Sequence, residues 1–267
     1  MPGSAVVTGA GRGFGREIAR LLAGRGYAVM CTDVDGAAAA ATAEQVGGRA
    51  MELDVRNPDA HRAAARAAAG EAPLEVWVNN AGVLRTVKAW EHSDEELRLL
   101  VEVNVLGVMH GTRAAVEAMR SVGGSNMHII NIASLSALTP VPGLAVYAAT
   151  KHAVLGFTGS VQGDLRLAGV PITVHALCPD AADTDMVRER AGDADAAIIF
   201  SAPRLLAAQE VAADAVSLLD SRQLVKVLPA WRGWVARATA LLGRNALVSA
   251  GALRRQGERR RARAGLS

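Results

Sequence analysis

A tyrosine and a lysine four positions apart are the side chains in this sequence best suited to acid–base chemistry. On a helix, Tyr147 and Lys151 would share one face, so the ammonium group can stabilise a phenolate. A free phenol titrates near pH ~10, and lowering its pKa by two or three units requires about 3 to 4 kcal/mol of differential stabilisation. We expect this pair to exchange a proton with a substrate oxygen, and Ser134 to hydrogen-bond the same oxygen.

A glycine-rich segment directly follows the first apolar run of the chain. It reads Thr8, Gly9, Ala10, Gly11, Arg12, Gly13, Phe14 and Gly15. Glycines here let the backbone turn sharply and approach a pyrophosphate, whose charge is met by unpaired amides at the start of the next helix. The segment predicts a dinucleotide-binding loop, and a tight structural turn is the alternative for this motif taken alone.

Two charged residues bear on which dinucleotide would bind. Asp33 ends the second apolar run, where its carboxylate can accept hydrogen bonds from the adenosine ribose hydroxyls and would repel a 2′-phosphate. Arg12 argues for the opposite choice, because its guanidinium group can neutralise an additional phosphate. The position of Asp33 is the more direct determinant, so we expect NAD, with NADP as the alternative.

Further motifs follow along the chain. They are Asp54-Val55 after the third apolar run, Asn79-Asn80-Ala81-Gly82 after the fourth, Asn104 between two valines, Ser134 after the fifth, and Tyr147 with Lys151 as Tyr-x-x-x-Lys. Each is weak alone, because a Tyr/Lys pair or a serine after a strand is usually structural. Together, in this order behind the glycine-rich loop, they make the sequence from Ser4 to about Met186 resemble the short-chain dehydrogenase/reductase family.

The resemblance implies a role for each of these residues. It places Asp54 and Val55 beside the adenine, and Asn80, Ala81 and Gly82 along the cofactor cleft. Lys151 would also hold the nicotinamide ribose, and Asn104 would support a water that passes protons to solvent. The implied reaction is hydride transfer between a nicotinamide and a secondary alcohol or ketone, with Tyr147 as the acid or base.

The segment after the sixth apolar run departs from the family pattern. Where the family has Pro-Gly and then Thr-x-Met, this chain has Pro179 and Asp180, then Thr184 and Met186. Pro179 and Thr184 remain expected cofactor contacts. An aspartate tolerates unusual backbone angles less well than glycine, and Asp180 and Asp183 would add negative charge near the nicotinamide. We therefore expect an altered turn beside the nicotinamide.

The family's substrate lid corresponds to residues 185–206, which here carry several large apolar side chains. They are Ile198, Ile199, Phe200, Leu205 and Leu206. A lid of this kind predicts a hydrophobic substrate held away from water. Asp193 and Asp195, in the same stretch, are expected in a solvated loop.

The histidines of the chain do not predict a metal site. Four of them, His110, His128, His152 and His175, are scattered along the sequence. None has a partner at convincing metal-ligand spacing, such as two histidines four apart with an acid between them. No catalytic metal is expected.

Apolar runs of strand length alternate with helical stretches, which predicts a parallel sheet covered by helices on both faces. The expected strands are Ala5–Thr8, Ala28–Thr32, Ala50–Leu53, Val76–Val78, His128–Ile132, Ile172–Leu177 and Leu224–Leu228. A long helix is expected over Asp94–Met119, capped by Ser93 with Glu96, and another over Tyr147–Leu167. The fold class is α/β, a Rossmann-like doubly wound sheet in one domain over residues 1–228, with a C-terminal extension over residues 229–267.

Composition favours a soluble, cytoplasmic protein. The chain of 267 residues is 51% apolar, enough for one sizeable core, yet no uninterrupted apolar run approaches the roughly 20 residues that span a bilayer. The N-terminus lacks a secretory pattern, and Cys31 and Cys178 lie in apolar runs expected to be buried. The net charge of +3 arises from an arginine-rich C-terminus, since the rest of the chain is nearly neutral.

The extension mixes tryptophans, leucines and arginines over Trp231–Leu253, which predicts an amphipathic helix. We expect it to cap the substrate cleft or to pack on a neighbouring subunit, and contact with a membrane surface is the alternative. Its basic run lacks interleaved aromatic residues, which argues against nucleic-acid binding. The resemblance implies a homo-oligomer, a dimer through the long helices or a tetramer.

Two other functions compete with a small-molecule dehydrogenase. One is a dinucleotide-sensing protein without turnover, and the other is a membrane-associated scaffold that uses the extension. The presence of Ser134, Tyr147 and Lys151 argues against the sensor, which has no need of an acid–base set.

Overall fold

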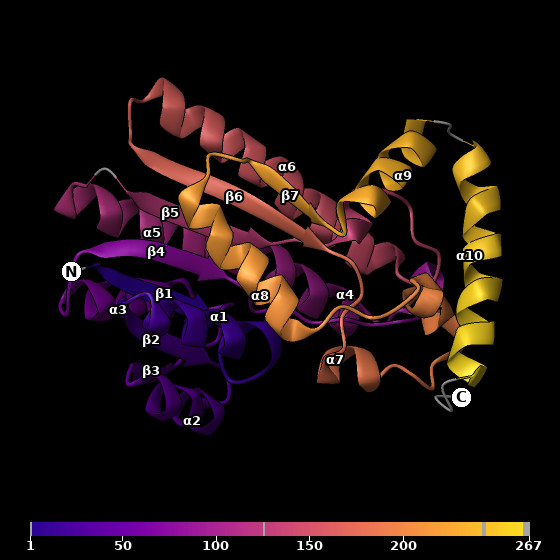
Figure 1. The fold of residues 1–267 in the computed structure, drawn as a ribbon, viewed down its shortest axis with the longest axis horizontal. Helices are drawn as coiled ribbons and strands as arrows, with labels where there is room; N and C mark the ends of the chain where they lie inside the picture. The colour runs from indigo at the N-terminus through magenta and orange to yellow at the C-terminus, as the bar shows by residue number, and fades with distance from the viewer. Residues whose placement is uncertain (1, 125, 242–243, 264–267) are drawn as a thin grey trace.

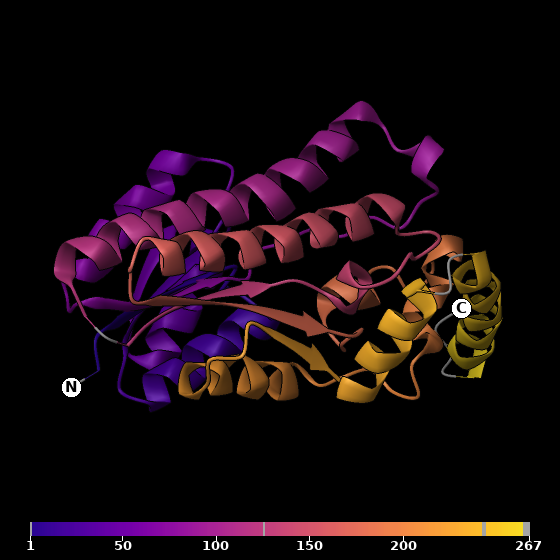
Figure 2. The ribbon, with the colours of Figure 1, turned by 90° about the horizontal axis from the view of Figure 1, so that it is seen from above.

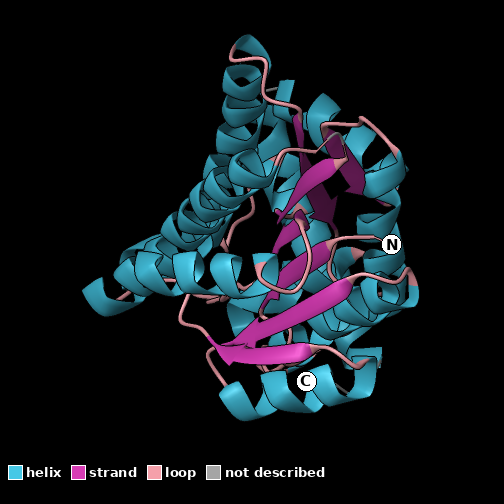
Figure 3. Cartoon of the chain, turned by 90° about the vertical axis from the view of Figure 1, so that its left-hand side faces the viewer, coloured by secondary structure: helices cyan, strands magenta, loops and turns pink. Residues whose placement is uncertain are grey.

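The computed structural model describes residues 2–124, 126–241 and 244–263 and contains a parallel sheet of seven strands. The strands are β1 (Ser4–Thr8), β2 (Ala28–Asp33), β3 (Arg49–Glu52), β4 (Leu74–Asn79), β5 (Met127–Ile132), β6 (Ile172–Pro179) and β7 (Val225–Leu228). Their order across the sheet is β3-β2-β1-β4-β5-β6-β7, and Figure 3 shows them between layers of helices. The order reverses between β1 and β4, where doubly wound sheets bind their ligands. The predicted fold class is confirmed.

Helices cover both faces of the sheet. The described helices of the chain are α1 (Gly13–Gly24), α2 (Gly36–Val46), α3 (Pro58–Ala69), α4 (Asp94–Val101), α5 (Gly107–Val122), α6 (Ala145–Leu167), α7 (Asp185–Arg188), α8 (Ala208–Ser217), α9 (Ala230–Leu241) and α10 (Arg244–Arg263). Short helical turns lie at η1 (Ala89–Glu91), η2 (Glu102–Leu106), η3 (Leu135–Ala137), η4 (Ala194–Ser201) and η5 (Leu218–Asp220). Helices α1 and α8 pack on one face and α3, α5 and α6 on the other (Figure 2).

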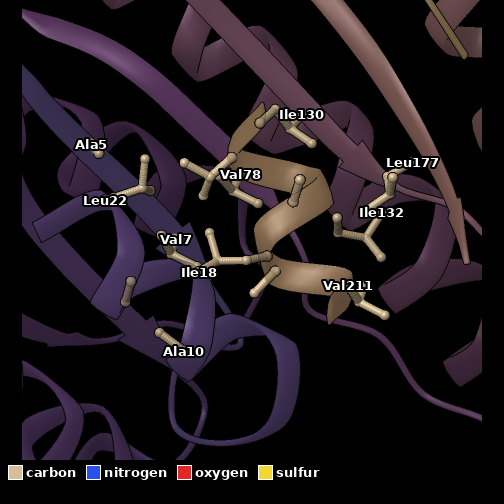
Figure 4. Packing of buried hydrophobic residues seen from close by; sticks show 14 of the residues in the cluster. Ala5, Val7, Ala10, Ile18, Leu22, Val78, Ile130, Ile132, Leu177 and Val211 are labelled. Carbon is tan, nitrogen blue, oxygen red and sulfur yellow. The ribbon is translucent and has the colours of Figure 1, made fainter. Parts of the chain in front are cut away.

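Successive buried residues of each central strand serve opposite faces, as the period of two requires. In β1, Val7 packs on the α1 and α8 side while Val6 faces α3 and α5. Figure 4 shows the first cluster, in which Ile18 of α1 and Val211 of α8 meet Val78 of β4. The two-sided burial explains the nearly continuous apolar runs of the central strands. It also fixes the carboxyl ends of the strands as a rigid edge.

The long helix predicted over Asp94–Met119 is present with a local distortion. It begins at α4, passes through a π turn, η2, and continues as α5 to Val122. The Ser93 hydroxyl accepts the backbone N–H of Glu96 (3.2 Å), as expected for the N-cap. The Glu96 carboxylate instead faces His92 (3.3 Å) and Arg85 (3.6 Å). The π turn shifts the face of the helix at Asn104, which bears on the site below.

By length and composition, the helical stretch Asp94–Val122 could cross a membrane. Half of its most apolar window is buried inside the fold, however, so its apolar side chains serve the core between α3, α6 and the sheet. Cys31 and Cys178 are likewise fully buried in strands, and both are free thiols. Burial raises the pKa of each thiol to about 11, so both are core residues at neutral pH.

Helices α9 and α10 lie beyond the two layers, next to the carboxyl ends of β5, β6 and β7 (Figure 1). The sequence predicts a single amphipathic helix over Trp231–Leu253, and the described residues of this stretch belong to two helices, α9 and α10. The extension therefore sits at the edge of the sheet where a ligand would bind.

Candidate active site

A cavity of about 800 Å³ opens at the carboxyl edge of the sheet, and most of the predicted site residues line it. Those lining it are Gly9, Arg12, Gly13, Phe14, Asp33, Asp54, Val55, Asn80, Ala81, Gly82, Ser134, Tyr147, Lys151, Pro179 and Thr184. Thr8, Gly11, Gly15 and Asn104 are not among the lining residues and support the cavity from behind. The structure thus brings together side chains from widely separated parts of the sequence.

The glycine-rich loop owes its shape to close backbone approaches. Gly9 has φ +64°, and a Cβ on Gly15 would lie 2.1 Å from the Gly9 carbonyl oxygen, so larger residues are excluded at both positions. The Asn80 side-chain amide donates to the carbonyls of Thr8 (2.8 Å) and Gly9 (3.0 Å). The Thr8 hydroxyl accepts the Asn80 N–H (3.0 Å), so the loops after β1 and β4 are locked together. The loop leads into α1, whose first amides are suited to a pyrophosphate.

Asp33 is fixed at the end of β2 by the same loop. Its carboxylate accepts the backbone N–H groups of Gly11 (2.9 Å) and Asp35 (3.1 Å). A Cβ on Gly11 would lie only 2.8 Å from an Asp33 oxygen, so glycine is needed for this approach. Arg12 extends instead toward the lid, 3.3 Å from Glu189 and 3.9 Å from Asp185. The carboxylate, and not the guanidinium group, is therefore held beside the strand end.

Asp54 and Val55 border the cavity after β3. Asp54 pairs with Arg56 at 2.6 Å, and this hydrogen-bonded pair holds the pKa of the Asp54 carboxyl below its usual range. Val55 packs against Gly107 of α5, where a Cβ would come within 2.9 Å of the valine methyl group. The two residues present an apolar surface with a charged rim, which suits one face of an adenine ring.

Ser134, Tyr147 and Lys151 meet at the deeper end of the cavity. The Ser134 hydroxyl forms a hydrogen bond with the Tyr147 phenol. Burial raises the pKa of this phenol to about 12, and the hydrogen bond from Ser134 opposes that rise. Lys151 lies with its ammonium 5.6 Å from the centre of the tyrosine ring and donates to the Ile132 carbonyl (2.9 Å). Burial lowers the pKa of Lys151 to about 8. The three side chains form the constellation expected from the sequence.

The lowered phenol pKa expected from the sequence requires Lys151 together with a bound, oxidised nicotinamide. Among the influences of the chain itself, burial is the largest, and it raises the pKa of Tyr147. Burial disfavours the phenolate and the ammonium alike, because both are charged. The chain by itself therefore keeps Tyr147 as a neutral phenol.

Asn104, in the π turn, ties helix α6 to the rest of the site. Its amide donates to the Val83 carbonyl (2.9 Å) and to the Thr150 hydroxyl (3.2 Å), and its carbonyl oxygen accepts the Val83 N–H (2.8 Å). Thr150 in turn donates to the Tyr147 carbonyl (2.7 Å). Asn104 is fully buried, so this network positions the turn of α6 that bears Tyr147.

Asp180, the departure from the family pattern, is a partner of the C-terminal extension. Its carboxylate lies 3.0 Å from the Arg232 guanidinium group of α9, and the two side chains are only 11% and 14% exposed. Burial raises the Asp180 pKa, and Arg232 opposes that rise. The backbone needs no positive φ at this position, so the expected backbone difficulty does not arise. The negative charge expected near the nicotinamide is offset by a cation that the sequence argument did not identify.

The lid also differs from expectation. Asp193 and Asp195 are not in a solvated loop, because the Asp193 carboxylate accepts from Thr86 and the Asp195 side chain is only 15% exposed. Asp183, by contrast, is an exposed partner of Arg188 (2.7 Å), and this pair lowers the Asp183 pKa. The apolar lining predicted from Ile198 and Ile199 is present in the cavity.

Several cavity residues escaped the sequence argument. They are Leu84, Leu135, Val141 and Leu144. Nothing in their local pattern separates them from ordinary core positions. Arg232 could have been sought, because an aspartate placed inside a binding cleft calls for a buried counter-charge. Within the described residues, no group of three His, Cys, Asp or Glu side chains could hold a metal ion.

Known proteins share both the sequence pattern and the fold. A family described as short chain dehydrogenase matches residues 4–195. The 3-oxoacyl-(acyl-carrier-protein) reductase FabG of Escherichia coli (strain K12) is 35% identical over 224 residues, which cover 81% of this chain and 89% of that protein. The 3beta-hydroxysteroid dehydrogenase of Mediterraneibacter gnavus is 34% identical over 195 residues, covering 70% and 69%.

A crystal structure extends the comparison to three dimensions. The short chain dehydrogenase/reductase from Burkholderia phymatum in complex with NAD is similar with a TM-score of 0.80 at 30% identity, covering 88% of this chain and 92% of that one. The family match spans most of the sheet and includes Ser134, Tyr147 and Lys151, and the two relatives named above match over most of their own length. The chain belongs to the short-chain dehydrogenase/reductase family of oxidoreductases.

Proposed function

We propose that the protein is an NAD-dependent oxidoreductase that interconverts a hydrophobic secondary alcohol and its ketone, with Tyr147 as the acid or base. The observation that carries this proposal is the meeting of Ser134, Tyr147 and Lys151 in a cavity whose adjoining wall is apolar. The bound nicotinamide would accept or supply the hydride. Ser134 would hold the substrate oxygen, and Tyr147 would exchange the proton.

The choice of NAD rests on Asp33 and Arg12. The fixed Asp33 carboxylate would accept hydrogen bonds from ribose hydroxyls and repel a 2′-phosphate. Arg12, the residue that could favour NADP, is engaged by acidic side chains of the lid region. The loop amides of Gly13 and Phe14, at the start of α1, would receive the pyrophosphate. Lys151 would hold the nicotinamide ribose, and Pro179 and Thr184 would border the nicotinamide.

The apolar character of the substrate is inferred from the cavity wall and agrees with one relative. Leu84, Leu144 and Ile199 gather beside Tyr147 in one buried cluster, with the lid supplying part of it. A relative named as a hydroxysteroid dehydrogenase acts on a substrate of this kind. We further propose a cytoplasmic homodimer through the long helices α5 and α6.

The direct test compares wild type with Tyr147→Phe on a panel of apolar ketones and alcohols, with NAD(H) and NADP(H) in parallel. Wild type should turn over with NAD(H) in preference to NADP(H), and the variant should lose about 10³-fold in turnover, because the proton donor is gone. Its NADH affinity, measured by fluorescence, should stay within about twofold. The only other tyrosine, Tyr27, lies at the opposite end of the sheet, so Tyr27→Phe is the matched control.

Two results would contradict the proposal. Full activity in Tyr147→Phe would remove the residue from the chemistry. Tight NADH binding by wild type with no turnover of any panel member would favour the dinucleotide-sensing alternative. Equal use of NADP(H) would reject the argument from Asp33 while leaving the reaction class standing.

A further inference from the structure

The C-terminal extension forms one wall of the same cavity. Val235 and Ala236 of α9, and Leu253 and Gln256 of α10, line it together with Ile198 and Ile199 of the lid. Figures 1 and 2 show both helices beside the lid, at the end of the molecule where the strands terminate.

We propose that α9 and α10 form a fixed roof over the substrate site, which holds the lid in place and selects compact, apolar ketones and alcohols by size. This inference rests on the proposed function, because it assigns the substrate class of that same site. It gives the arginine-rich C-terminus a role inside the molecule.

Arginines of the extension contact the lid at both ends of η4. At one end, Arg261 donates to the Asp193 carbonyl (2.6 Å), and Arg254 faces the Asp195 carboxylate at 3.8 Å. At the other end, the Ser201 carbonyl accepts from Arg260 and its hydroxyl accepts from Arg232 (3.3 Å). We call Arg232, Arg254, Arg260 and Arg261 the arginine clamp. Three of its four contacts go to backbone carbonyl or hydroxyl oxygens of the lid, and only one goes to a carboxylate. The clamp therefore holds the lid backbone in place and does more than neutralise a charge.

The clamp is seated by a close helix-to-lid approach. Gly257 of α10 lies so near η4 that a Cβ would fall 1.8 Å from the Ala197 carbonyl oxygen. A glycine in mid-helix costs about 1 kcal/mol relative to alanine, so its presence here needs a packing reason, which this contact supplies. On its other side, the lid approaches the loop before α6, where a Cβ on Gly143 would lie 2.3 Å from the Asp195 carbonyl. The lid is thus held between α10 and the loop that leads to Tyr147.

The surface that roof and lid present to the cavity is apolar, and the charges near it are paired. Asp180 is matched by Arg232, and Asp195 is matched by Arg254. Val235, Leu253 and Ile198 supply aliphatic surface. Because these charges already compensate each other, a substrate with its own charge would lack a counter-charge there, whereas an apolar substrate needs none. The arrangement therefore fits a substrate whose only polar anchor is the oxygen beside Ser134 and Tyr147.

The first experiment measures amide hydrogen exchange in η4 and substrate kinetics in the double variant Arg260→Ala/Arg261→Ala. Loss of two clamp contacts should speed exchange of the η4 amides at least tenfold and raise the KM for bulky bicyclic ketones about tenfold. The affinity for NADH should not change. The matched control is Arg255→Ala/Arg259→Ala, which removes the same charge from exposed positions of the same helix.

A second variant tests the size of the roof. In Leu253→Trp, the larger side chain should fill part of the substrate space next to α10. The ratio of kcat/KM for a small cyclic ketone to kcat/KM for a bicyclic ketone should therefore rise at least tenfold. The proposal is overturned if the clamp variant and its control behave alike in exchange and KM, or if Leu253→Trp leaves the ratio unchanged. The proposal is also overturned if wild type binds anionic vesicles, Arg255→Ala/Arg259→Ala abolishes that binding, and the clamp variant keeps its substrate selectivity. That result would give the extension a membrane role.

These readouts separate the two proposals. If wild type reduces no ketone, the proposed function fails, while amide exchange in η4 with NADH bound still decides whether the clamp holds the lid. If wild type is active and Tyr147→Phe is inactive, but the clamp variant and Leu253→Trp keep the substrate selectivity of wild type, only the further inference fails.

Discussion

At the scale of single residues, burial is the main influence on the reacting groups. It raises the pKa of Tyr147 to about 12 and lowers that of Lys151 to about 8, since each change removes charge from a site with little water. The chain by itself therefore keeps a neutral phenol beside Ser134, which is the protonation state required to reduce a ketone. Oxidation of an alcohol requires the phenolate and should be favoured as the pH rises.

The buried pair Asp180–Arg232 gives a prediction at this scale. Restoring the family's glycine with Asp180→Gly should destabilise the protein by about 3 kcal/mol, because Arg232 would be left as an unpaired buried cation. Adding Arg232→Leu should recover most of that loss. Urea unfolding of the two single variants and the double variant would give the coupling energy, which we expect to exceed about 2 kcal/mol. Additive effects, within about 0.5 kcal/mol, would show that the pair is not coupled.

At the scale of elements, a histidine pair joins β5 to β6 away from the site. His175 donates through Nδ1 to the Gln223 carbonyl (2.7 Å), so its other nitrogen accepts from Nδ1 of His128 (3.0 Å) when both rings are neutral. The rings are stacked and buried. The pKa of His128 is lowered to about 4. Burial is the largest cause, and the neighbouring His175 adds to it. Protonation of His175 at Nε2 would remove this acceptor, and protonation of His128 at its other nitrogen would place a charge in a buried site.

This pair predicts a pH-dependent stability. Because the folded pKa of His128 lies below its unfolded value of about 6.5, the unfolded chain binds more protons between pH ~4 and ~6.5. The stability that the neutral ring contributes is present above pH ~6.5 and is lost as the pH falls toward ~4, by about 3 kcal/mol. Replacing His128 with leucine should make the fall in unfolding free energy between pH 7 and 4.5 smaller by about 2 to 3 kcal/mol. His152→Gln, at an exposed position, should behave as wild type, and an unchanged pH slope in the His128 variant would refute the assignment.

The elements also show what a sequence can and cannot predict. The parallel strands and the cofactor loop follow from short-range signals, because two-sided burial gives continuous apolar runs and a sharp turn requires glycine. The amphipathic pattern of the extension predicts that it covers the substrate cleft, a neighbouring subunit or a membrane surface, and only contacts between residues far apart in sequence decide among these. Arg232 meets Asp180 only because β7 returns beside β6, a contact between residues far apart in sequence. The histidine pair depends on strand register in the same way.

At the scale of the whole molecule, the cavity has two parts of different origin. The cofactor part is built from loops that follow the first five strands, and the sequence predicts most of its residues. The substrate part is built from the lid, which the family match reaches only as far as residue 195, and from the extension, which lies beyond that match. We therefore expect the shared part to determine the reaction class and the extension to contribute to the substrate class.

The most direct test of the central claim follows the hydride itself. Wild-type protein would reduce an apolar ketone with NADH carrying deuterium at the transferring position of the nicotinamide, in ordinary water, and mass spectrometry would locate the label. We predict deuterium on the carbinol carbon of the product, because hydride passes directly from nicotinamide to substrate while Tyr147 supplies an exchangeable proton to the oxygen. Product without the label, or no product from a protein that binds NADH tightly, would contradict the account.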